Sequence, residues 1–252
     1  MNLIADRKLD DFLNGGKILR ESLIETADAA KPGVTLLALN NIAEESIRKR
    51  GGRPSFLNYS SDGSRNFPAS LCVSINDAVV HGIPKAGISL RDGDVVSLDL
   101  GVEFRGMYTD MAETMIVGQP KNKSDINLIE ATKKSLEKAI ALAYVGRRIG
   151  DIGNAIEEIA TQSGFCVVKS LVGHGIGEAP HQDPQVPNFG KKGTGDVLLP
   201  GVALAIEPML VDGKAEVYTD IDGWTVRTKS GNKSAHFEKT ILITKKDPIV
   251  VT

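Results

Sequence analysis

The feature that most restricts the fold of this chain is a set of carboxylates inside apolar, strand-like segments. Asp99 lies in VVSLDLGV and Glu207 lies in ALAIEPML, and the neighbours of both residues are apolar on each side. A charge buried in such a strand costs free energy unless it is paired or binds a metal ion. The fold must therefore bury these strands and give their carboxylates a common partner.

Two further carboxylates lie in similar surroundings. Asp110 lies in YTDMAETM and Glu238 lies in AHFEKTILIT. Two adjacent strands joined by a tight turn would place alternate residues of both strands on the same face of a sheet. We therefore expect Asp99 and Asp110 to share one face.

The four histidines divide into two groups. His81 in SINDAVVHGIP and the pair His174 and His181 in GHGIGEAPH are flanked by glycine or proline on predicted loops, which favours a functional role. His236 in SAHFEK lies inside an apolar run, which is typical of a buried structural histidine.

These side chains suggest a metal centre. The candidate set is rich in oxygen and free of cysteine, which suits Mn, Fe or Co better than a structural zinc site. It has too many ligands for one tetrahedral ion and fits two ions about 3.5–4 Å apart, the arrangement of two-metal hydrolases. The set is Asp99, Asp110, His174, Glu207 and Glu238.

The hydrophobic pattern predicts an α+β fold of two related halves, each with helices followed by strands. The predicted helices cover residues 6–30, the segment from a cap at Thr35 to 51–54, the segment from a cap at Ser124 to about Tyr144, and the segment from a cap at Asp151 to just before Gly164. The predicted strands cover 71–75, 95–104, 108–117, VVKSLV, VALAIEPMLV and AHFEKTILIT.

Composition excludes several classes of protein. The chain has 30 Lys and Arg against 32 Asp and Glu, which argues against DNA or RNA as its main partner. Two cysteines, Cys72 and Cys166, are too few for a disulfide framework. The N-terminal segment has no signal-peptide pattern, and no stretch is apolar enough to span a membrane. We therefore expect a cytoplasmic protein that contacts neither DNA nor membranes.

The motifs resemble those of the type I methionine aminopeptidases, a family of pita-bread metallopeptidases. The matching segments are SINDAVVHGIP, DGDVVSLDLGV, YTDMAETMIVG, GHGIGEAPHQDPQVPNF, AIEPM and SAHFEKTILIT. The resemblance implies one catalytic domain over residues 1–252. It also implies the pita-bread fold, with two pseudo-symmetric halves around a dinuclear metal centre.

The resemblance also implies roles for the metal ligands. Asp110 and Glu238 would bridge two divalent ions (Co, Mn, Fe or Zn). Asp99 would complete the site of the second ion, and His174 and Glu207 that of the first. A water or hydroxide between the ions would attack the first peptide carbonyl, with Glu207 as proton acceptor.

The remaining site residues would bind the substrate. His181 would stabilise the developing oxyanion, and His81 would contact the scissile amide. An apolar slot suited to methionine would be formed by Tyr59, Phe67, Cys72 and Trp224. Three features depart from the family pattern: SSDGSRN separates Tyr59 from Phe67, Pro180 precedes His181, and Gln182 follows it.

The expected reaction is removal of the initiator methionine from nascent polypeptides in which a small residue follows. Because the expected substrates are nascent chains, the ribosome is a candidate partner. We expect the protein to be a monomer. An X-Pro aminopeptidase of the same fold is an alternative, although those enzymes usually carry an extra N-terminal domain and different histidine motifs. A catalytically silent binding module is a second alternative, but such relatives lose ligands that this chain retains.

Overall fold

The computed structural model describes residues 3–60, 63 and 65–252. The four predicted helices are present, preceded by one short 3-10 turn. They are η1 (Asp6–Lys8), α1 (Leu9–Ala29), α2 (Leu36–Lys49), α3 (Lys123–Ala141) and α4 (Ile149–Gln162). Within the described ranges, no helix has the length and apolar character needed to cross a membrane.

The helix starts were predicted with mixed success. Thr35 is the N-cap of α2, as expected, but α3 is capped by Asn122 rather than by Ser124. The asparagine side chain accepts the Asp125 backbone N–H at 2.8 Å and donates to the Asp125 carboxylate at 2.9 Å. Only a start at Asn122 provides this reciprocal pair, because it places an acidic residue at the third helical position.

The predicted cap of α4 was also wrong. Asp151 does not precede the helix but lies in its first turn, and Arg148 occupies the N-cap position. The Asp151 carboxylate accepts the backbone N–H of Arg148 at 2.9 Å, so it satisfies the helix start from inside the helix.

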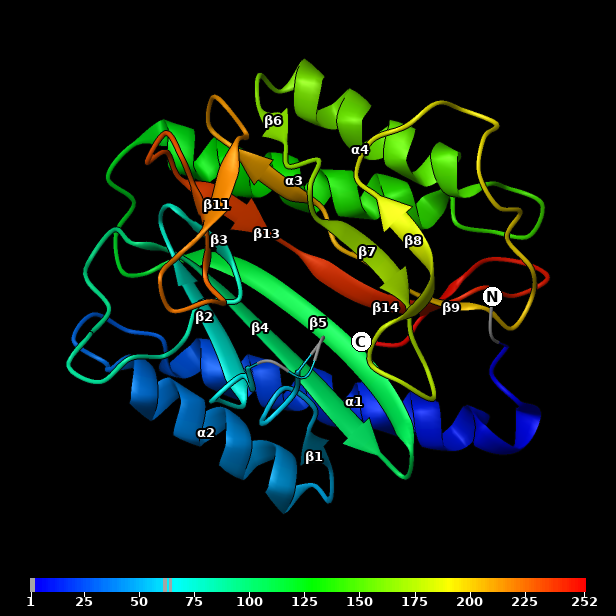
Figure 1. Cartoon of the computed structure of the whole chain (residues 1–252), viewed down its shortest axis with the longest axis horizontal. Helices are drawn as coiled ribbons and strands as arrows, with labels where there is room; N and C mark the ends of the chain where they lie inside the picture. The colour runs from blue at the N-terminus through cyan, green and yellow to red at the C-terminus, as the bar shows by residue number, and fades with distance from the viewer. Residues whose placement is uncertain (1–2, 61–62, 64) are drawn as a thin grey trace.

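The strands form one large antiparallel sheet and two small ones (Figure 1). The large sheet has nine strands in the order β1-β4-β5-β14-β9-β7-β8, with β2 paired to β4 and β15 paired to β14. The small sheets have the orders β13-β10-β6 and β11-β12-β3. The bounds are β1 Arg53–Pro54, β2 Leu71–Ile75, β3 Ala78–Val80, β4 Val95–Phe104, β5 Met107–Ile116, β6 Cys166–Val167, β7 Val172–Gly175, β8 Gln182–Pro187, β9 Ala203–Ile206, β10 Met209–Val211, β11 Val217–Thr219, β12 Val226–Thr228, β13 Ser234–His236, β14 Glu238–Leu242 and β15 Ile249–Val250.

Three segments predicted as single strands are divided. VVKSLV contains only the last residue of β6 and the first residue of β7, VALAIEPMLV breaks between β9 and β10, and AHFEKTILIT breaks at Phe237 between β13 and β14. Pro208 has no N–H for a sheet ladder, so β9 ends beside it. At the last two breaks the chain passes between the large sheet and the β13-β10-β6 sheet.

The β4–β5 hairpin confirms the predicted placement of the first two carboxylates. Its two-residue turn is Arg105–Gly106, and both residues have positive φ, at 51° and 81°. Such turns match the twist of paired strands and fix their register. Asp99 lies opposite Ala112, and Gly101 lies opposite Asp110, so the two carboxylates are diagonal neighbours on one face.

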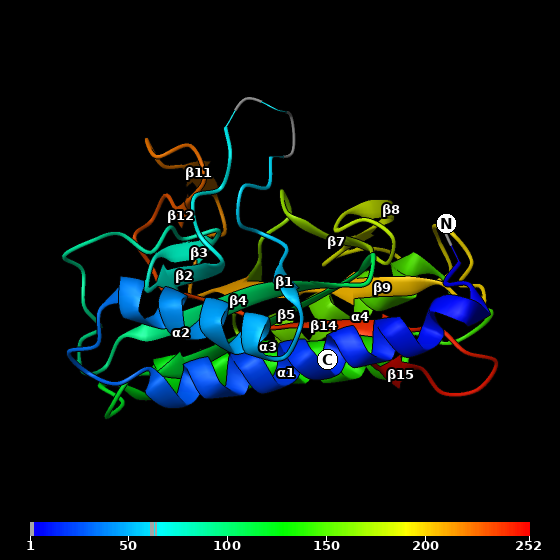
Figure 2. The ribbon, with the colours of Figure 1, turned by 90° about the horizontal axis from the view of Figure 1, so that it is seen from below.

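The helices cover the other face of the sheet (Figure 2). In β4 the alternate residues Val96, Leu98, Leu100 and Val102 pack into a core shared with α1 and α2. A second core joins α3 and α4 to residues of β9 and β14. The chain therefore has two α+β halves, each with its own helix pair, and Asp99 points away from the helices.

Neighbouring glycines in α1 predict opposite effects on stability. A Cβ atom at Gly15 would make ordinary contact with Phe104 Cβ at 3.5 Å, whereas one at Gly16 would overlap the carbonyl of Val251. We expect Gly15→Ala to stabilise the fold by about 0.5–1 kcal/mol. Gly16→Ala should instead destabilise it by about 1–3 kcal/mol. Urea unfolding of both variants tests this, and equal shifts would contradict it.

Candidate functional site

A cavity of about 490 Å³ lies on the face of the sheet to which Asp99 and Asp110 point. Every site residue predicted from the sequence lines it, and Phe56 is an addition that the sequence interpretation missed. An aromatic residue in a loop carries no sign of whether it faces a core or a cavity. The lining residues are Phe56, Tyr59, Phe67, Cys72, His81, Asp99, Asp110, His174, His181, Glu207, Trp224 and Glu238.

The five candidate ligands come from five adjacent strands of the large sheet. They are Asp99 on β4, Asp110 on β5, Glu238 on β14, Glu207 directly after β9 and His174 on β7. Asp99 and Glu238 both lie opposite Ala112, from its two sides. The small side chain of Ala112 leaves space between the two carboxylates, and a longer one would occupy it.

The ligand atoms converge. Donor atoms of Asp110, His174 and Glu238 all lie within 4.8 Å of one another. His174 Nε2 is 3.6 Å from Glu207 Oε1 and 4.0 Å from Glu238 Oε1. His174 Nδ1 lies 3.0 Å from the carbonyl oxygen of Gly175, which orients the ring so that the Nε2 lone pair faces the carboxylates.

The electrostatics of this group require cations. Burial raises the pKa of Asp99 to about 6 and that of Glu207 to about 8. Burial, together with the neighbouring carboxylates, raises the pKa of Asp110 and Glu238 well above the usual range. Four ionised carboxylates cannot share this space without positive charge.

Unsatisfied atoms point to the same conclusion. Asp99 Oδ1 and Glu238 Oε1 are buried and have no hydrogen-bond partner among the described residues. Buried carboxylate oxygens normally have one, and a divalent cation would satisfy both atoms. Burial also lowers the pKa of His174 to about 3, which leaves its imidazole neutral and able to bind a metal. The residues present therefore fit divalent metal ions.

The other two predicted histidines lie above this group of ligands. The His181 ring centroid is 4.3 Å from that of His174 and 5.1 Å from that of Tyr59. His81 follows β3 with a φ of 57°, and its ring meets the Trp224 ring edge-on at 6.3 Å. Burial lowers the pKa of His81 to about 4 and also lowers that of His181. Both rings are neutral at pH 7, so each can donate one N–H.

One wall of the cavity is apolar. Phe67 makes edge-to-face contacts with Phe56 and Trp224, at centroid distances of 6.5 and 5.4 Å, and Cys72 is buried against them. Burial raises the pKa of the Cys72 thiol well above its usual range, so it behaves as an apolar group.

The extra residues of SSDGSRN do not separate Tyr59 from Phe67. Phe67 N donates to the Tyr59 carbonyl at 2.7 Å, and Asn58 N donates to the Phe67 carbonyl at 2.9 Å. The inserted segment therefore starts and ends at one point, and both rings line the cavity. Residues 61, 62 and 64 lie outside the described part.

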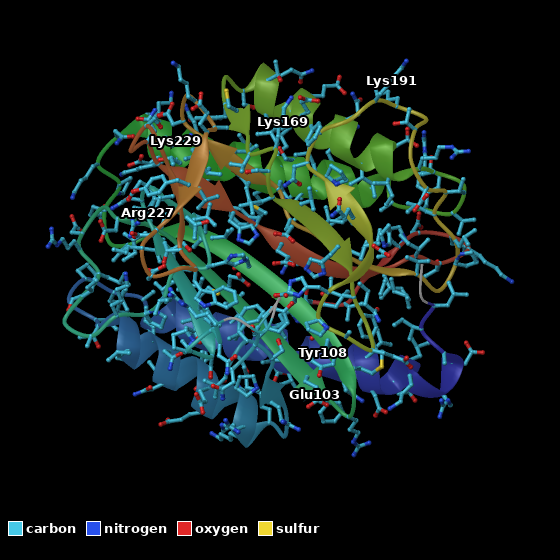
Figure 3. The ribbon with its side chains drawn as sticks, in the orientation of Figure 1. Glu103, Tyr108, Lys169, Lys191, Arg227 and Lys229 are labelled. Atoms are coloured by element: carbon cyan, nitrogen blue, oxygen red, sulfur yellow. The ribbon has the colours of Figure 1, made fainter. Side chains whose placement is uncertain are left out.

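Ion pairs and a backbone hydrogen bond hold the loop that carries Trp224 in place at the cavity. Arg227, labelled in Figure 3, binds Asp77 at 2.9 Å and Asp220 at 2.8 Å. The Asp222 carboxylate accepts the backbone N–H of Trp224 at 3.0 Å. These contacts fix the loop between β11 and β12 beside His81.

His236 is the second residue that the sequence interpretation missed. It is only 2% exposed, as expected for a buried histidine, but it belongs to a group with Glu207 and Glu238 rather than to an apolar core. The available signal was its position two residues before Glu238 in the predicted strand AHFEKTILIT, in which alternate residues would share a face. The apolar residues around it concealed this.

Comparisons with known proteins agree with the site. The profile of metallopeptidase family M24 matches residues 12–245. The chain is 44% identical to a methionine aminopeptidase of Clostridium perfringens over 98% of this chain and 96% of that protein. The crystal structure of methionine aminopeptidase from Thermotoga maritima superposes with a TM-score of 0.96 at 37% identity, covering 100% and 99% of the two chains.

A more distant structure shares the fold alone. Prolidase from Pyrococcus furiosus has a TM-score of 0.79 at 18% identity, and the match covers 99% of this chain but 65% of that one. These solved structures confirm the predicted pita-bread fold. The sequence identity to the methionine aminopeptidases is higher than that to the prolidase. The chain belongs to metallopeptidase family M24 and, within it, to the methionine aminopeptidases.

Proposed function

We propose that this protein removes the N-terminal methionine from polypeptides in a metal-dependent hydrolysis. The observation that carries the proposal is the convergence of four carboxylates and one imidazole from five adjacent strands at one cavity. The family match and the related methionine aminopeptidases support the same reaction. We further propose that residues 1–252 act as one catalytic domain, since the large sheet draws strands from both halves.

The centre would hold two divalent ions, with Co, Mn, Fe and Zn all acceptable to these donors. Asp99, Asp110, His174, Glu207 and Glu238 would hold these ions. Bound ions would polarise the first peptide carbonyl and lower the pKa of water toward neutrality.

The chain's own residues supply the proton transfers and orientation. Glu207 lies at the cavity, and its carboxylate, ionised when metal is bound, would take up a proton during hydrolysis. The neutral His181 would donate an N–H to the oxygen on which negative charge develops. His81, on the other side of the cavity beside Trp224, would contact the scissile amide.

The apolar wall suits the unbranched thioether of methionine. We propose that Tyr59, Phe67, Cys72 and Trp224 form this pocket. The physiological substrates would be nascent polypeptides with methionine first and a small second residue. The protein would act as a monomer in the cytoplasm, with the ribosome as a candidate partner.

Peptide cleavage tests the proposal. Metal-stripped protein receives Mn²⁺, Co²⁺ or Fe²⁺ and is offered Met-Ala-Ser, Met-Lys-Ser, Leu-Ala-Ser and Ala-Pro-Ser. We expect metal-dependent release of methionine from the first peptide alone, lost in Glu207→Gln. Cleavage of Ala-Pro-Ser alone would indicate an X-Pro aminopeptidase. Absence of cleavage with metal bound would indicate a binding module.

The pocket assignment predicts a change in selectivity. Trp224→Ala should lower the ratio of kcat/KM for Met-Ala-Ser over Leu-Ala-Ser by about tenfold, because hydrophobic pockets discriminate by about 1–3 kcal/mol. A matched control is Tyr218→Ala, an exposed aromatic residue on β11. An unchanged ratio in the Trp224 variant would remove this residue from the methionine pocket.

A further inference from the structure

We propose that His236 is a positioning residue that donates its Nε2–H to the carboxylate pair of Glu207 and Glu238. The inference rests on the proposed metal centre, to which both carboxylates belong. It assigns a function to the one histidine that the sequence pattern marks as structural.

The imidazoles of His174 and His236 approach opposite oxygens of the same two carboxylates. His174 Nε2 faces Oε1 of Glu207 and of Glu238, at 3.6 and 4.0 Å. His236 Nε2 faces Oε2 of the same residues, at 3.6 and 3.8 Å. A shift of about half an ångström in either carboxylate brings His236 Nε2 to hydrogen-bond distance.

His236 reaches the carboxylates from outside the cavity. Among the described residues, His174, Glu207 and Glu238 line the cavity and His236 does not. Its backbone is held firmly, since its N–H donates to Thr114 Oγ at 2.9 Å and its carbonyl accepts from the same hydroxyl at 2.6 Å. A side chain so placed supports the carboxylates and does not touch substrate.

The surroundings of Nδ1 distinguish a histidine that binds metal through Nε2 from one that donates a hydrogen bond through Nε2. A histidine that binds metal through Nε2 almost always donates Nδ1–H to a carboxylate, a backbone carbonyl or water. His174 has that partner in the Gly175 carbonyl at 3.0 Å. Neither ring nitrogen of His236 has a hydrogen-bond partner among the residues described, but Nε2 faces the Glu207 and Glu238 carboxylates at 3.6 and 3.8 Å.

The proton of His236 therefore belongs on Nε2. A proton on Nδ1 would be a buried donor without an acceptor, whereas a proton on Nε2 faces two carboxylate oxygens. A protonated Nε2 has no free lone pair with which to bind a metal ion. His236 thus orients Glu207 and Glu238, and His174 remains the imidazole suited to bind the ion.

The first test is nitrogen NMR of ¹⁵N-histidine protein loaded with Zn²⁺, which is diamagnetic. The chain has only four histidines, and His236→Gln identifies the signal by its loss. We expect His236 to carry its proton on Nε2 without a metal shift, and His174 to carry its proton on Nδ1 with a metal-shifted Nε2. A metal-shifted Nε2 on His236 would make it a ligand and overturn the proposal.

The second test compares two variants in the metal-loaded protein. His236→Gln keeps an N–H donor near the Nε2 position and should retain most of kcat. His236→Leu removes the donor and should lower kcat or Mn²⁺ affinity by about 10- to 100-fold, with little change in KM. Equal behaviour of the two variants would overturn the proposal. Failure of the unmodified protein to cleave Met-Ala-Ser would instead count against the proposed function.

Discussion

Glu238→Gln is expected to lose about 10³-fold or more in kcat/KM for a methionine peptide. Glu238 is 3% exposed and lies between His174 and His236, opposite Ala112 in the sheet. The amide keeps the shape of the side chain but removes the charge that the ions need. A loss of about 4 kcal/mol in transition-state stabilisation corresponds to about 10³ in rate.

The same variant should not be less stable when metal is absent. Burial and three neighbouring carboxylates raise the pKa of Glu238, which means that its charge is unfavourable in the metal-free fold. Replacing it with a neutral amide removes the free-energy cost of protonating this group on folding. Urea unfolding of metal-free Glu238→Gln should therefore give a midpoint at or above that of the unmodified protein.

The control is a glutamate on the adjacent strand with no part in the site. Glu113 on β5 is half-exposed and forms an ion pair with Lys239 at 3.4 Å. Exposed pairs contribute about 0–1 kcal/mol, so Glu113→Gln should keep its activity. Full activity in metal-loaded Glu238→Gln would remove this residue from the catalytic centre.

The sequence predicts most of this site because buried charges are rare. Asp99 and Glu207 stand out against apolar neighbours, and the alternation of β4 and β5 places Asp99 and Asp110 on one face from local information alone. Grouping them with His174 and Glu238 is different, since those residues lie on strands distant in sequence. The donor chemistry of these side chains suggested that grouping and the family resemblance supported it, and the strand order now explains it.

Two of the missed features depend on segments that are distant along the chain. His236 looks like a core residue until β9 brings Glu207 beside it and Glu238. The division of AHFEKTILIT at Phe237 is invisible in a continuous apolar run, because it depends on which sheet each part joins. The cap of α3 was missed for a local reason, since both Asn122 and Ser124 are good capping residues.

The second large effect concerns the metal-free protein, whose stability should fall as pH rises from about 6.5 to about 8. In this window the unfolded chain has ionised carboxylates, whereas burial raises the folded-state pKa of Glu207 to about 8 and that of Asp110 well above its usual range. The folded state therefore binds more protons than the unfolded state, and its stability decreases with pH. Each retained proton contributes about 1.4 kcal/mol per pH unit.

The histidines set the lower limit of this window. Burial lowers the pKa of His174 to about 3 and of His81 to about 4, against an ordinary value of 6.5. Below pH 6.5 the histidines of the unfolded chain take up protons, whereas the buried rings of the folded state stay neutral. Stability in this range therefore rises with pH, which opposes the effect of the carboxylates. Above this range both states have neutral histidines, and the carboxylates act alone.

Divalent metal should reverse the slope. Bound ions require ionised carboxylates, so metal binding releases protons and strengthens as pH rises. Stability measured by urea unfolding should fall between pH 6.5 and 8 in protein treated with EDTA, and rise over the same range with saturating Mn²⁺. Glu207→Gln should flatten the slope of the metal-free protein. A metal-free protein whose stability is constant or rises across this window would show that these carboxylates are already ionised, and the electrostatic case for a cation centre would fail.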